Sequence, residues 1–155
     1  MSYDRDRVLA LLNQILEAEL AGVVRYTHYS LMVFGHARIP IVGWLRSQAQ
    51  ESLQHAHQAG ELVTHLGGHP SLAIGSLLET EQHSIDAILS ESLAHERATL
   101  ELYHGLLGEV ESKSVMLEEY ARKMIEAEEL HLGEVDKMMR RPGSTDSVRP
   151  SLQEG

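Results

Sequence analysis

Glutamate and histidine recur in this chain of 155 residues at spacings that suit metal binding. The stretch "EAEELH" places Glu128 three residues before His131, and the stretch "QAQESLQHAHQAG" (48–60) adds two more histidines. In a helix, residues at i and i+3 lie on one face, so this carboxylate and imidazole can reach a shared site. The sequence contains no cysteine, so a metal must be held by nitrogen and oxygen ligands. Such mixed ligation suits iron, manganese or zinc.

The elements that must position these residues are four helices, because prolines and glycine clusters separate four long stretches with helical periodicity. The first and second helices, and the third and fourth, are joined by short connections, so each pair should be antiparallel. About fifteen residues, "GGHPSLAIGSLLETE", join the second helix to the third and can cross the length of a bundle. We predict an all-α antiparallel four-helix bundle with helices at 5–36, 40–66, 82–111 and 114–140.

The crossover contains apolar residues and is expected to pack on the outside of the bundle; these residues are Leu72, Ile74, Leu77 and Leu78. Residues 142–155 have the composition of a polar tail. The predicted domain therefore spans residues 1–141.

Each helix carries an apolar seam, and every seam is interrupted by polar residues near its middle. Helices packed side by side bring these midpoints to one level. Buried carboxylates without partners cost several kcal/mol each, whereas bound cations neutralise them. The sequence therefore predicts a metal site at the centre of the bundle, near Glu19, Ser52, His55, Glu96, Glu128 and His131.

Other candidates fall elsewhere on the helices. The second Glu-x-x-His pair, Glu101 with His104, is predicted to be solvated surface. Tyr26 and Tyr103 lie on the seams and are predicted core residues whose hydroxyls can hydrogen-bond a ligand. Histidines off the seams are predicted surface residues, namely His57, His65, His69, His83 and His95.

The charge of the chain limits its partners. With 23 acidic and 13 basic residues the formal net charge is −10. Nucleic acid and anionic membranes both reward a positive surface, so neither is an expected partner. No segment approaches the ~20 apolar residues of a membrane span, and the first residues, "MSYDRDRVLALL", lack the long apolar segment of a signal peptide. A cytoplasmic protein is expected.

Across roughly residues 8–140 the chain resembles bacterioferritin, within the ferritin-like superfamily. The motifs that carry the resemblance are "LLNQILEAELAGVVRY", "QHAHQAGELVTHLGGHPSL", "LAHER" and "EAEELH". The resemblance implies a ferritin-like fold and a di-iron ferroxidase centre that oxidises Fe(II) with dioxygen or peroxide, usually in an iron-storing shell. The metal ligands that it implies are Glu19, His55, Glu96, Glu128 and His131.

The chain departs from the family pattern on the second helix. Ser52 stands where the family has a bridging glutamate, one position after Glu51. Glu51 and His55 are ~40° apart around the helix, against ~60° for an i, i+3 pair, so Glu51 can reach the metals by a different approach. We therefore add Glu51 to the predicted ligands. Leu53 replaces the family's haem-binding methionine and cannot ligate iron, so no haem is expected at that site.

A further departure concerns assembly. The family's shell uses a short fifth helix, whereas Pro142 and Gly143 end the fourth helix here and a polar tail follows. No fifth helix is predicted, and a homo-oligomer of at least two chains, either a dimer or a smaller shell, is expected.

Three functions fit these observations. The first is a ferroxidase for iron detoxification or storage. The second is a ferritin-like di-metal oxidase or oxygenase of an organic substrate, which would need an apolar channel to the site. The third is a degenerate, non-catalytic ferritin-like protein, which is favoured if Ser52 has disabled the centre.

Overall fold

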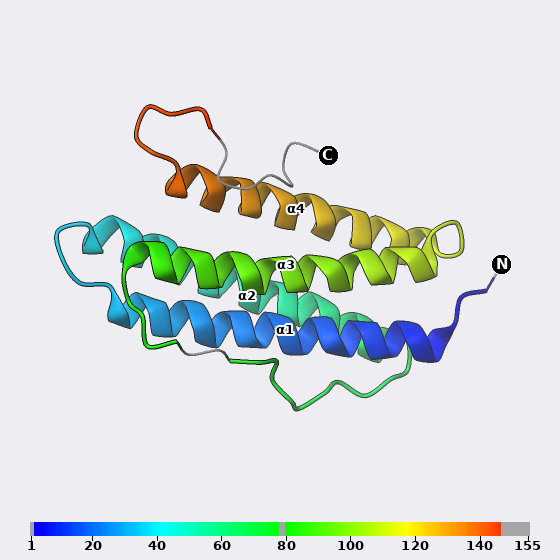
Figure 1. The fold of residues 1–155 in the computed structure, drawn as a ribbon. Coiled ribbons are helices and arrows are strands. Elements are labelled where there is room, and N and C mark those ends of the chain that lie inside the picture. The colour runs from blue at the N-terminus through cyan, green and yellow to red at the C-terminus, as the bar shows by residue number, and fades with distance from the viewer. Residues whose placement is uncertain (1, 78–79, 147–155) are drawn as a thin grey trace.

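The computed structural model describes residues 2–77 and 80–146, and in these ranges it contains four helices and no strand. The helices are α1 (Arg5–Met32), α2 (Arg38–His65), α3 (Ile85–Val110) and α4 (Val115–Met139). Figure 1 shows them side by side, with α1 antiparallel to α2, α3 antiparallel to α4, and the crossover running back along the outside of α1. The predicted all-α four-helix bundle with a long crossover is confirmed.

The helix ends follow local capping. The side chains of Asp4, Ser84 and Ser114 each accept a hydrogen bond from the backbone N–H three residues later, at 3.1–3.3 Å. Such caps satisfy N–H groups that a helix cannot pair internally. The Ser84 cap explains why α3 begins at residue 85 and not at 82. Helix α1 ends at Met32, four residues earlier than predicted, because Val33 has an extended backbone.

Apolar residues fill the bundle on both sides of its polar centre. At the end near the α3–α4 connection, Leu12, Leu106 and Leu117 are fully buried in one cluster. At the opposite end, Leu45 and Ile88 lie in a second cluster. Burying each such side chain contributes about 1.5–3 kcal/mol. These apolar layers fix the four helices at a common level, and so position the polar residues between them.

The crossover is held to α1 by polar contacts and not by its apolar side chains. The Gly75 N–H donates to the Glu17 carbonyl at 2.9 Å, and Asn13 bonds the backbone of residues 69 and 71. A Cβ at residue 75 would lie 3.0 Å from the Glu17 carbonyl oxygen, so this close approach favours glycine. The prediction that the crossover packs outside the bundle is confirmed, but by a different set of contacts.

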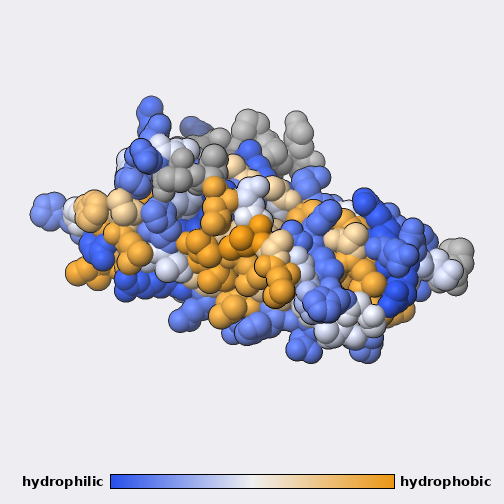
Figure 2. Space-filling view, turned by 90° about the horizontal axis from the view of Figure 1, so that it is seen from below, coloured by the Kyte–Doolittle hydropathy of each residue, from blue (hydrophilic) through white to orange (hydrophobic). Residues whose placement is uncertain are grey.

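The apolar side chains of the crossover point to solvent. Leu72 is 98% exposed, Leu77 is 50% exposed and Ile74 is 45% exposed, while Leu78 lies outside the described residues. We call Leu72, Ile74 and Leu77 the crossover face. Figure 2 views the molecule from this side and shows hydrophobic residues gathered across its middle. Contiguous exposed apolar surface of this kind often marks an interaction site.

The structure describes the chain after α4 for a short distance. Residues 140–146 form no further helix, and residues 147–155 lie outside the described part. The expected absence of a fifth helix can thus be followed only to residue 146. None of the helices in the described ranges is long and apolar enough to cross a membrane.

Candidate metal centre

The structure brings five of the predicted ligands together at the middle of the bundle. Glu19 comes from α1, His55 from α2 and Glu96 from α3, while α4 contributes Glu128 and His131. The three carboxylates are only 3–5% exposed. Ionised groups at this depth need charged or hydrogen-bonding partners, so their side-chain contacts determine what the site can bind.

One half of the centre forms around His55. Its Nδ1 atom lies 3.5 Å from Glu19 Oε2 and 3.7 Å from Glu128 Oε1. Each of these three residues offers one ligand atom, and those atoms lie within 4.8 Å of one another. Two carboxylates and one imidazole at such separations can hold a divalent cation.

The other half forms around His131. Its Nε2 atom lies 3.8 Å from Glu96 Oε1. The Tyr26 hydroxyl donates to the same Glu96 oxygen at 2.6 Å and lies 3.1 Å from His131 Nε2. The ring of Trp44 stacks on the His131 ring at a centroid distance of 5.9 Å and an interplanar angle of 2°. These contacts fix the imidazole and the carboxylate before any ion binds.

The two seam tyrosines are fully buried, as predicted, and both donate to the centre. The Tyr103 hydroxyl bonds Glu19 Oε1 at 3.1 Å, as the Tyr26 hydroxyl bonds Glu96. Burial raises the pKa of both phenols well above its usual range. Each phenol therefore stays neutral and orients one carboxylate.

The buried carboxylates of the centre lack enough positive charges and hydrogen-bond donors from the protein. Burial, reinforced by the charge of Glu96, raises the pKa of Glu128 well above its usual range, and burial also raises the pKa of Glu19. Glu128 Oε2 is buried without a hydrogen-bond partner among the described residues. A divalent cation would supply both the missing partner and the missing positive charge. The donor set therefore fits a metal.

The profile of the ferritin-like domain family matches residues 9–142 of this sequence. The chain belongs to the ferritin-like domain family. A comparison with curated proteins finds no match.

Solved structures agree with this assignment. A ferritin-like, diiron-carboxylate protein from Bacillus anthracis has a TM-score of 0.82 and 23% identity, over 90% of this chain and 100% of that one. A dodecameric thioferritin, the bacterioferritin-related protein of Bacteroides fragilis, has a TM-score of 0.81 and 20% identity, over 88% and 86%. The bacterioferritin of Mycobacterium tuberculosis has a TM-score of 0.76 and 25% identity, over 88% and 86%.

On α2, the predicted ligand Glu51 does not join the other ligands at the centre. The Glu51 side chain is 49% exposed, and its Oε1 atom lies 3.9 Å from Nε2 of His55. That nitrogen is on the opposite side of the ring from Nδ1, which faces Glu19 and Glu128. Glu51 thus stands outside the group of three ligands and beside the outer nitrogen of one of them.

Glu51 also marks the opening of the site. A cavity of about 10 Å³, close to the volume that one water requires, lies at the centre. Most of its lining comes from α2 and α4, with the half-exposed Glu51 among the residues. The opening between α2 and α4 is therefore acidic.

Among the other histidines, His57, His65, His69 and His104 are exposed, as predicted, and Glu101 is exposed too. The surface prediction is wrong for His83 and His95, which are half-buried. Burial lowers the pKa of His95, whose ring enters the space between α3 and α1. The signal that could have found it is Gly22, since a glycine on the facing helix leaves room for a large side chain.

Proposed function

We propose that this protein is a ferroxidase that oxidises Fe(II) at a di-iron centre, in iron detoxification or storage. The observation that carries the proposal is the buried Glu128 carboxylate between the two histidine-containing halves of the site. Two Fe(II) ions each lose one electron. With two protons, this electron pair converts dioxygen to hydrogen peroxide, or hydrogen peroxide to two waters.

Each half of the centre supplies one iron position in this proposal. Glu19 and Nδ1 of His55 would hold the first ion, and Glu96 with His131 would hold the second. Glu128 would bridge them, because its Oε1 atom faces His55 and its carboxyl group interacts with Glu96. The fixed positions of these side chains reduce the rearrangement that iron binding requires.

We propose that Glu51 orients His55 and attracts Fe(II) at the opening. Its contact with Nε2 supports this role, because a carboxylate on the outer nitrogen of a metal-bound imidazole fixes the ring and increases its basicity. To act as a metal ligand, as the sequence predicted, Glu51 would have to turn its side chain inward. If Glu51 orients His55 from outside, replacing Glu51 by Gln should weaken Fe(II) binding without abolishing oxidation.

The test is aerobic addition of Fe(II), with Fe(III) formation followed in the near ultraviolet. The wild-type protein should oxidise Fe(II) faster than buffer alone, and Glu128→Ala should abolish the difference. Glu129→Ala is the matched control, because Glu129 is the next residue and is exposed. Oxidation by the wild type at the buffer rate would contradict the proposal and favour a degenerate ferritin-like protein.

We further propose that the chain acts as a homo-oligomer of at least two copies. The crossover face supports this, because Leu72, Ile74 and Leu77 are exposed on one connection. The Bacteroides fragilis relative is described as dodecameric. Light scattering should give a mass of two or more chains, and Leu72→Glu combined with Ile74→Glu should lower it. A monomeric wild type would contradict this proposal.

A further inference from the structure

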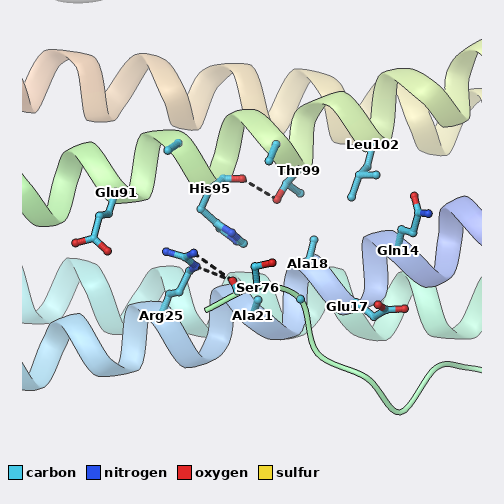
Figure 3. A pocket seen from close by; sticks show the side chains of 13 residues that line it. Gln14, Glu17, Ala18, Ala21, Arg25, Ser76, Glu91, His95, Thr99 and Leu102 are labelled. Atoms are coloured by element: carbon cyan, nitrogen blue, oxygen red, sulfur yellow. Dashed lines mark hydrogen bonds between the residues drawn. The ribbon is translucent and has the colours of Figure 1, made fainter. Parts of the chain in front are cut away.

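A second, larger pocket lies on the opposite side of the bundle from the acidic opening. It has a volume of about 530 Å³ and is formed by α1, α3 and the crossover. Figure 3 shows His95 descending from α3 into its middle, above Ala18 and Ala21 of α1. The small alanine side chains of both helices leave this space open, with Ala94 and Ala98 lining it from α3.

Only a thin wall separates this pocket from the metal centre. A Cβ placed on Gly22 of α1 would lie 3.3 Å from His95 Nε2 and 2.8 Å from Ser52 Oγ. His95 lines the large pocket, whereas Ser52 lines the metal cavity. The two side chains therefore approach the same point of α1 from the two cavities, and residue 22 has no side chain to keep them apart.

The serine at position 52 makes this wall thin. A glutamate there would extend past the serine oxygen, which already lies near Gly22 on the inner side. With serine, the three heavy atoms nearest to a Cβ at residue 22, outside the local helix, belong to Ser52 and His95.

The lining of the pocket favours a small neutral molecule. The Arg25 guanidinium donates to the Ser76 carbonyl at 3.1 Å and to the Tyr29 hydroxyl at 3.1 Å. The Glu91 carboxylate accepts from the hydroxyls of Tyr29 and Thr80. The charges of Arg25 and Glu91 are thus occupied by protein groups. Glu17 is the remaining charged residue of the lining, and the surface around His95 is mainly alanine.

We propose that this pocket binds the small neutral oxidant, dioxygen or hydrogen peroxide, and admits it to the metal centre past His95. The inference rests on the proposed ferroxidase function. The two reactants would then arrive from opposite faces, Fe(II) at the acidic opening between α2 and α4 and the oxidant between α1 and α3. His95 would act as a gate and not as a metal ligand.

Two variants test the passage in kinetics. Gly22→Ala adds a methyl group between His95 and Ser52, and Ala98→Phe fills the pocket from an exposed position of α3. Both should lower kcat/KM for the oxidant severalfold while leaving KM for Fe(II) unchanged. The matched control is Gly108→Ala, since no described atom outside the local helix lies within 4 Å of a Cβ there.

The assay is run with dioxygen and, separately, with hydrogen peroxide under anaerobic conditions. A severalfold fall in either arm supports the proposal and identifies the oxidant that uses the pocket. Anaerobic Co(II) absorption spectra check that each variant keeps its metal centre. Intact Co(II) binding with unchanged kcat/KM for both oxidants, in both variants, would overturn the proposal.

Xenon binding in crystals tests the pocket without iron, and so separates this inference from the proposed function. Xenon mimics a small neutral gas and binds apolar cavities. Crystals of the wild type pressurised with xenon should show it beside His95, and crystals of Ala98→Phe should not. Xenon absent from this pocket in the wild type would overturn the inference even if the protein is a ferroxidase. An inactive wild type that binds xenon there would refute the ferroxidase proposal, and with it the delivery of oxidant, but not the binding of a small neutral molecule in this pocket.

Discussion

Replacing Glu128 by Gln should stabilise the metal-free protein at neutral pH while removing its response to metal. Glu128 is 4% exposed, and its Oε2 atom lacks a hydrogen-bond partner among the described residues. Gln has nearly the same shape but carries no charge. Its amide can donate to the neighbouring carboxylates, whose charges raise the pKa of Glu128.

The pH dependence of this gain follows from proton linkage, and its size from the unsatisfied acceptor. The folded-state pKa of Glu128 is raised well above 4.5, so folding favours its protonated form. That contribution is fully present below about pH 4.5 and is lost as the pH rises through the raised value. Each unit of raised pKa corresponds to about 1.36 kcal/mol. An unsatisfied buried acceptor costs about 1–3 kcal/mol, which sets the expected gain for Glu128→Gln near pH 7.

Thermal unfolding of the metal-free protein measures this gain, at a fixed chain concentration because association also shifts Tm. For a chain of this size, the expected shift is about 2–4 °C per kcal/mol. The difference in Tm between Glu128→Gln and the wild type should shrink as the pH is lowered toward 4.5. Co(II) at about 100 times its Kd should stabilise the wild type by about 2.7 kcal/mol and the variant far less.

The control is Glu129→Gln, because Glu129 is the exposed neighbour of Glu128. It should change neither the metal-free Tm nor the stabilisation by Co(II). Two results would contradict this prediction: a lower Tm for Glu128→Gln at neutral pH in the absence of metal, or a variant that keeps the full response to Co(II). In the first case the carboxylate has an unrecognised partner. In the second, Glu128 is not a ligand.

Three further changes follow from single contacts. Ser52→Glu should tighten binding of the second Co(II) ion in calorimetric titrations and lower the metal-free Tm, because it restores a buried carboxylate beside the centre. Tyr103→Phe removes the 3.1 Å hydrogen bond to Glu19 and should cost about 0.5–1.5 kcal/mol in urea unfolding; an unchanged midpoint would contradict that bond. Gly75→Ala places a Cβ 3.0 Å from the Glu17 carbonyl oxygen and should speed proteolysis within the crossover, whereas cleavage at the wild-type rate would show that the contact can relax.

The fold could be predicted because each helix carries a long periodic seam bounded by proline or glycine. The same periodicity predicted the convergence of Glu19, His55, Glu96, Glu128 and His131, since polar interruptions at the middle of seams must meet. Helix ends were less accurate. A cap such as Ser84 depends on one local hydrogen bond that periodicity does not contain.

What could not be predicted depends on side-chain direction. Position 95 lies beside the seam of its helix, and its ring is half-buried only because Gly22 and Ala18 leave space on the facing helix. Angles around α2 allowed Glu51 to approach the metals, but they did not fix which nitrogen of His55 it meets. The apolar residues of the crossover suggested burial, whereas backbone hydrogen bonds hold this segment and leave those residues outside.

Anomalous diffraction from crystals soaked with Fe(II) under anaerobic conditions would locate iron at the centre. We expect two iron peaks, one against Glu19 and Nδ1 of His55 and the other against Glu96 and His131. Glu128 should lie between the peaks, and Glu51 should remain on the outer nitrogen of His55. A centre without iron, or with a single ion that Glu128 does not contact, would contradict the proposed di-iron centre.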